Sequence, residues 1–105
     1  MRMLLKISIP TETGNETIKS GVLPQTVGNF VETVKPEASY FVGMDGNRTA
    51  LFFFDMNETV DLPALVEPFM MNLNAKIELT PAMDVKTRKA KLKGWKDAVR
   101  RTLTT

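Results

Sequence analysis

Residues 38–56 have the sequence ASYFVGMDGNRTALFFFDM, in which two apolar runs flank the turn-forming triplet Asp45-Gly46-Asn47. Aromatic and β-branched residues favour strands, and Asp, Gly and Asn tolerate the positive φ angles of a tight turn. The pattern predicts a β-hairpin with strands over 38–44 and 48–56. Both faces of these strands are apolar, which is typical of a sheet that is covered on both sides. In the first strand Tyr40, Val42 and Met44 lie on one face and Phe41 on the other. In the second strand Phe52 and Phe54 lie on one face and Leu51 and Phe53 on the other.

The segment before the hairpin predicts one strand and two helical pieces. Residues 3–9 alternate between the apolar set Met3, Leu5, Ile7, Ile9 and the set Leu4, Lys6, Ser8, as in a strand, and Pro10 ends it. Thr13 and Glu16 have capping-box spacing, so a short helix is expected to begin there and to end near Gly21. A second helix is expected from Leu23-Pro24 to Lys35-Pro36, with its apolar face at Leu23, Val27, Phe30, Val31 and Val34.

The segment after the hairpin predicts a helix, a strand and a last helix. Asp61 would cap the first of these helices, with Pro63 in its first turn, and Pro68 is expected to kink or shorten it. Residues 75–80 alternate as a strand that Pro81 closes. A C-terminal helix capped by Asp84 would carry a thin apolar stripe of Val85, Leu92, Trp95, Val99 and Leu103.

The resulting order is β-α-β-β-α-β with an additional C-terminal helix, which predicts an α+β fold. This succession is typical of a ferredoxin-like sheet, antiparallel and four-stranded, with two helices on one face and strand order 4-1-3-2. At 105 residues the chain is expected to form a single domain, with a ferredoxin-like core over 1–82 and a basic helix over 83–105. The second face of the sheet would then be covered either by the C-terminal helix or by a second copy of the chain.

In element order, and in residues 3–9, 38–56 and 75–80, the chain resembles small bacterial-type members of the dimeric α/β-barrel group. In that group two ferredoxin-like sheets pack face to face. The resemblance implies a dimeric α/β barrel, and therefore a homodimer, with a small organic ligand between sheet and helices. The group is functionally mixed and includes cofactor-free oxygenases, haem proteins and ligand-sensing domains, so the resemblance transfers no catalytic residue to this sequence.

The composition excludes several classes of chemistry, because the chain contains neither Cys nor His. A disulfide, a thiolate nucleophile, a Cys/His zinc site, a haem ligated by imidazole and a Ser-His-Asp triad are all impossible within one subunit. Carboxylates, Lys, Arg, Tyr, Ser and Thr remain. We expect no cofactor and no metal, and any enzymatic activity would be independent of a cofactor.

The formal net charge of +2 hides an uneven distribution along the chain. Residues 84–105 hold eight bases and two acids, a charge of +6, whereas residues 1–83 hold six bases and ten acids, a charge of −4. There is no secretory signal pattern at the N-terminus, and no stretch approaches the length of about 20 apolar residues that a membrane span needs. A cytoplasmic protein that does not bind membranes is therefore the expectation.

Four polar side chains on or near apolar strands are candidate catalytic or ligand-binding residues. Lys6 interrupts a central strand and would need a partner, for which Glu78 or Asp55 is suitable. Lys6 would either bind a carboxylate or enolate or act as a base, and the alternative is a purely structural ion pair. Tyr40 would orient a ligand or simply pack, and Asp55 would be a pocket carboxylate or a turn residue. Arg48, beside the turn, is expected to be solvated.

The basic C-terminal segment offers a different class of function. Its anion-binding candidates are Lys86, Arg88, Lys89, Lys93 and Arg100, which would contact a nucleic-acid backbone in a salt-sensitive manner. Trp95 is the single aromatic residue there, so base stacking would be weak. Three hypotheses remain open: a small-molecule-binding homodimer with or without enzyme activity, a weak binder of anionic polymers, and a structural or assembly module.

Overall fold

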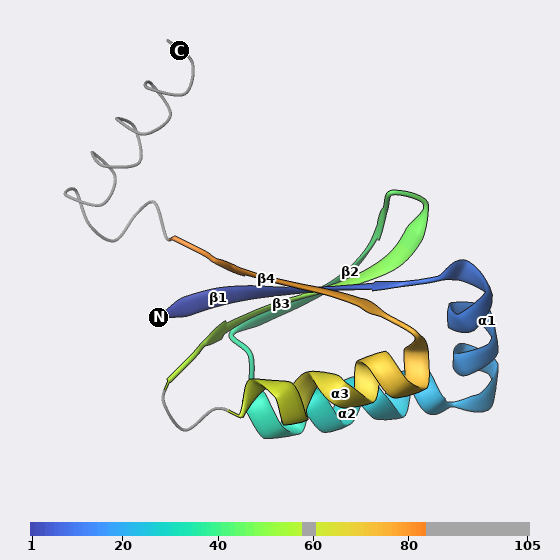
Figure 1. The fold of residues 1–105 in the computed structure, drawn as a ribbon, viewed down its shortest axis with the longest axis horizontal. Coiled ribbons are helices and arrows are strands. Elements are labelled where there is room, and N and C mark those ends of the chain that lie inside the picture. The colour runs from blue at the N-terminus through green and yellow to red at the C-terminus, as the bar shows by residue number, and fades with distance from the viewer. Residues whose placement is uncertain (58–60, 84–105) are drawn as a thin grey trace, which may run out of the picture.

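The computed structural model describes residues 1–57 and 61–83, which form an antiparallel sheet with helices packed below it (Figure 1). The elements are β1 (Arg2–Ile9), α1 (Thr11–Ser20), α2 (Val22–Val34), β2 (Ala38–Met44), β3 (Asn47–Asp55), α3 (Leu62–Leu73) and β4 (Lys76–Pro81). The fold is therefore α+β, as the sequence predicts, and it is compatible with a ferredoxin-like fold. The expected C-terminal helix over 83–105 falls almost wholly outside the described residues.

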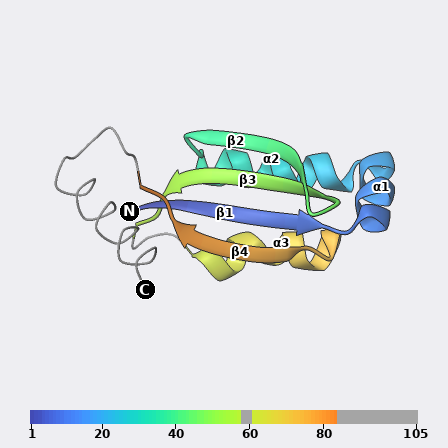
Figure 2. The ribbon, with the colours of Figure 1, turned by 90° about the horizontal axis from the view of Figure 1, so that it is seen from above.

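The four strands lie in the order β2-β3-β1-β4, which is 4-1-3-2 from the other edge (Figure 2). All three pairings are antiparallel. The β2–β3 hairpin closes through Asp45 and Gly46, whose φ angles are 54° and 78°. Two consecutive positive φ angles are the geometry of a two-residue type I′ turn, which confirms the hairpin that the sequence predicts.

The helix boundaries follow local sequence signals, with one correction. α1 begins at Thr11 with Pro10 at its N-cap, so the predicted capping box of Thr13 and Glu16 is wrong: both residues are inside the helix. Pro10 has the extended backbone of an N-cap residue, and the helix begins directly after it. Gly21 ends α1 at a φ of 85°, as expected, because glycine occupies the left-handed region at little cost.

The third helix is also close to expectation. The Asp61 side chain caps α3 by accepting a hydrogen bond from the backbone N–H of Ala64 at 3.4 Å. Pro68 does not shorten the helix, which continues to Leu73. A proline in the middle of a helix removes one N–H donor. The burial of Phe69 and Leu73, which follow the proline in α3 and are fully buried against the sheet, compensates for this lost hydrogen bond.

The core lies between the sheet and the helices α2 and α3. β1 contributes every second residue, Met3, Leu5, Ile7 and Ile9, and β3 contributes Ala50, Phe52 and Phe54. Phe30 of α2 is the centre of an aromatic cluster, with ring centroids 4.7 Å from Phe52 and 5.4 Å from Phe69. This alternation confirms the expected faces of residues 3–9 and fixes the register of the sheet.

The opposite face of the sheet carries no helix from the described residues (Figure 1). We call it the open face, and it is defined by the register positions Leu4, Lys6, Ser8, Tyr40, Val42, Leu51, Phe53, Glu78 and Thr80. Its apolar part lies on β2 and β3, where the Tyr40 side chain is 55% exposed. In residues 1–57 and 61–83 no helix has the length and apolarity needed to cross a bilayer.

Candidate functional site

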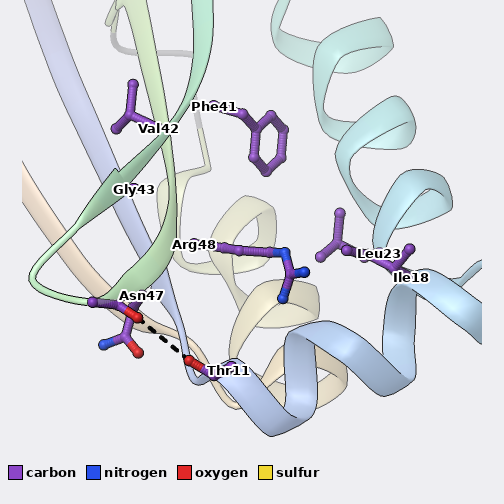
Figure 3. Close-up of a pocket in the computed structure, with 9 residues that line it drawn as sticks. Thr11, Ile18, Leu23, Phe41, Val42, Gly43, Asn47 and Arg48 are labelled. Carbon is purple, nitrogen blue, oxygen red and sulfur yellow. Dashed lines mark hydrogen bonds between the residues drawn. The ribbon is translucent and has the colours of Figure 1, made fainter.

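A groove of about 670 Å³ lies between the turn end of the β2–β3 hairpin and the helices α1 and α2 (Figure 3). We call it the hairpin groove. Its size falls in the range of small-molecule sites, which is about 300–1,000 Å³. The residues that line it are Thr11, Ile18, Leu23, Phe41, Val42, Gly43, Gly46, Asn47 and Arg48.

The wall of the hairpin groove is largely apolar and open to solvent. Phe41 points from β2 into the space facing α2, and its side chain is 51% exposed. Ile18 near the end of α1 is 44% exposed, whereas Leu23 near the start of α2 is buried. Large apolar side chains that remain half exposed around one concavity are typical of a ligand site rather than of a closed core.

Arg48 is the charged residue of this groove. It is the second residue of β3 and pairs with Ile9 on one side and Gly43 on the other, so its side chain lies on the helix side of the sheet. Its Nη1 donates a hydrogen bond of 2.7 Å to Oδ1 of Asn15 in α1. Within residues 1–57 and 61–83 the Arg48 guanidinium forms no ion pair with a carboxylate. A partly buried cation with a neutral partner is suited to bind an anion.

Two glycines make room around Arg48. A Cβ built on Gly14 in α1 would lie 3.1 Å from Nη1 of Arg48 and 3.6 Å from Ile9, so the absent side chain lets the guanidinium lie across the helix. A Cβ on Gly43, which also lines the groove, would meet nothing within 4 Å and would project into the open space of the groove. Thr11 at the start of α1 also lines the groove, and its hydroxyl donates a hydrogen bond of 3.4 Å to the carbonyl oxygen of Gly46.

None of the four candidate residues lines the hairpin groove, and three of them lie in one row across the open face. The register places Tyr40, Leu51, Lys6 and Glu78 side by side on successive strands. Nζ of Lys6 lies 3.6 Å from a carboxylate oxygen of Glu78, one of the two partners that the sequence suggests for Lys6. Leu51 separates Tyr40 from Lys6 by two strand spacings, about 10 Å. Tyr40 and Lys6 are thus on one face but not in contact.

Asp55 lies at the far end of β3, away from this row. Its Oδ1 accepts a hydrogen bond of 2.8 Å from the amino group of Met1. That hydrogen bond and the positive charge of the amino group lower the pKa of Asp55. Asp55 also lines a second cavity of about 420 Å³, between the end of α2 and the start of α3. It therefore has a local ionic partner and no contact with the hairpin groove.

The sequence reasoning missed Arg48, Phe41 and Ile18 as a group. The available signal was Gly14, a glycine inside a helical stretch, which can mark a close approach of another group. The basic candidates Lys86, Arg88, Lys89, Lys93 and Arg100 lie outside the described residues. In residues 1–57 and 61–83 no three carboxylate, His or Cys side chains are grouped as a metal site would require.

The fold and the groove define a small α+β protein with a ligand-sized, mostly apolar concavity beside one arginine. No family model matches the chain. A stretch of 23 residues, 22% of the chain, is 87% identical to part of the glycerol kinase of Rhizobium rhizogenes. The match spans 5% of the length of that curated relative. A segment so short carries neither a fold nor an activity from one protein to the other.

Proposed function

We propose that this chain is a binding protein for a small organic molecule, which enters the hairpin groove between sheet and helices. The observation that carries the proposal is the groove itself, with the half-exposed Phe41 and Ile18 on its opposite walls. Apolar side chains left open in a concavity of this size gain free energy when a ligand covers them.

The placement of the polar side chains favours binding over catalysis. Lys6, Tyr40, Asp55 and Glu78 do not line the hairpin groove. A catalytic acid or base must lie within hydrogen-bonding reach of the reacting atoms. Cofactor-independent catalysis would therefore use the open face, and binding is the function that the geometry of the hairpin groove supports best.

We further propose that the functional unit is a homodimer of the dimeric α/β-barrel type, in which a second copy covers the open face. The support is the apolar cluster of Tyr40, Leu51 and Phe53, which no helix of residues 1–57 and 61–83 covers. Tyr40 and Phe53 lie in edge-to-face geometry with ring centroids 6.4 Å apart. Tyrosine and phenylalanine are both enriched at protein interfaces.

The groove proposal is tested by filling the groove from the strand side. Gly43→Val places a branched side chain where a Cβ meets nothing, and valine suits a strand. Ser39→Val is the matched control, because Ser39 lies on the same face of β2 but does not line the groove. We expect naphthamide, a neutral aromatic probe, to shift the amide NMR resonances of the groove in the wild type and in Ser39→Val but not in Gly43→Val. Equal shifts in all three proteins would refute the site.

The dimer proposal is tested by changing the charge of the open face. Tyr40→Lys places a cation in the exposed apolar cluster, and Val31→Lys makes the same kind of change on the outer side of α2. Native mass spectrometry should show a dimer for the wild type and Val31→Lys and a monomer for Tyr40→Lys. A monomeric wild type, or a dimer that Tyr40→Lys leaves intact, would contradict the proposal.

A further inference from the structure

We infer that the ligand of the hairpin groove is an organic carboxylate that bears one negative charge and an apolar, ring-sized body, with Arg48 as its anchor. This inference rests on the proposed function, since it names the class of molecule that the same groove takes. It is carried by the charge of the groove, the free donors of Arg48 and the way in which α1 holds the guanidinium.

The charge of the groove favours a single anion. Among the described residues that line it, Arg48 is the one charged side chain, and the rest are apolar or neutral. A molecule with several negative charges would therefore place uncompensated charge against Ile18, Leu23 and Phe41, which is costly. A neutral molecule would leave the guanidinium with Asn15 as its one hydrogen-bonded partner in the described part of the chain.

The hydrogen-bonding capacity of Arg48 favours a carboxylate. An arginine carries five N–H donors in a planar fork, and the structure uses one of them, on Nη1, for Asn15. Two adjacent donors therefore remain for a bidentate contact, and this geometry matches the two oxygens of a carboxylate. A lysine at this position would supply the charge without the fork.

The position of the guanidinium is held from the α1 side. Asn15 accepts the hydrogen bond from Nη1, and Gly14 leaves the space in which the group lies. Asn15 is therefore a positioning residue. Phe41 and Ile18 stand on opposite sides of the space beside the guanidinium, so a ligand anchored there would place its apolar body between them (Figure 3).

The test compares naphthoate with naphthamide, because the two probes share one ring system and differ in charge. Because the carboxylate of naphthoate would form a charge-assisted hydrogen-bonded pair with Arg48, we expect naphthoate to bind the wild type at least about tenfold more tightly than naphthamide does. Asn15→Asp keeps the shape of the side chain but gives Arg48 a carboxylate partner at the same place. We expect this variant to lose the preference for naphthoate while it binds naphthamide as before.

Two further variants control for charge and for folding. Asn29→Asp makes the same change of net charge on the exposed surface of α2 and should keep the tenfold preference. Arg48→Met removes the charge, retains an unbranched apolar stem and should bind both probes equally. If Arg48→Met fails to fold, Asn15→Asp still decides the question, because Asp and Asn have similar helix propensities and the new carboxylate has Arg48 as its partner.

Each outcome has a distinct meaning. Binding of naphthoate and naphthamide with equal affinity to the wild type would overturn the carboxylate inference and leave the groove proposal standing. If neither probe shifts the groove resonances, both proposals are refuted. Tighter Arg48-dependent binding of naphthyl phosphate than of naphthoate would overturn the choice of a carboxylate, since the anion would then be a phosphate ester.

Discussion

Phe52→Ala tests the register that places Phe41 and Arg48 on the helix side of the sheet. The Phe52 side chain is 1% exposed, and its ring centroid lies 4.7 Å from that of Phe30 and 6.3 Å from that of Phe69. Truncation of a fully buried phenylalanine costs about 3–5 kcal/mol, because transfer and cavity terms add. We expect a value near the upper end, since two aromatic contacts, each worth about 0.5–1.5 kcal/mol, are lost together.

Phe53→Ala is the matched control, because Phe53 is the next residue of β3 and lies on the open face, where it is only partly buried. Its truncation should cost about half as much or less, in proportion to the area that it removes from water. Urea unfolding followed by far-UV circular dichroism measures both values in the Tyr40→Lys background, in which the proposed dimer does not form and Phe53 stays partly exposed. Equal losses, or a larger loss for Phe53→Ala, would mean that the register differs by one residue and that Arg48 points away from the hairpin groove.

Three further predictions concern the ends of elements. Gly21→Ala should destabilise the protein by about 1–2 kcal/mol in urea unfolding, because an alanine at a φ of 85° is strained, and an unchanged midpoint would contradict this backbone geometry. Asp61→Ala should lower the free energy of unfolding by about 0.5–2 kcal/mol through loss of the cap of α3, whereas Asp61→Asn should keep most of the stabilisation by the cap. The contact with the Met1 amino group lowers the pKa of Asp55 in the folded protein. The stabilisation by Asp55 is therefore present above the unfolded pKa of about 3.9, and it is lost as the pH falls through the folded pKa. Asp55→Asn should therefore flatten the acid limb of the stability–pH profile below about pH 4, and an identical acid limb in both proteins would show that the contact contributes nothing.

Much of the fold follows from local signals in the sequence. The turn at Asp45-Gly46 could be predicted because few residues accept positive φ at two consecutive positions. The buried set of β1 could be predicted because strand side chains alternate. The start of α1 could not be predicted from the sequence. Thr13 and Glu16 have the spacing of a capping box, but both residues lie inside a helix that begins at Thr11.

The hairpin groove was much harder to predict than the fold. Arg48 alone looks like a solvated residue beside a turn. Its role depends on the close approach of α1 at Gly14 and Asn15, a contact that joins residues 33 positions apart. Lys6 shows the reverse case, because its pairing with Glu78 follows from the antiparallel register of adjacent strands and could be expected from the pattern alone.

We propose that a ligand binds in the hairpin groove rather than on the open face. A crystal structure of the protein with naphthoate distinguishes these two places. We expect density for the ring between Phe41 and Ile18, with both carboxylate oxygens within hydrogen-bonding distance of the Arg48 guanidinium. A well-occupied probe beside Lys6 and Tyr40 on the open face, with the hairpin groove empty, would show that the ligand site is the open face.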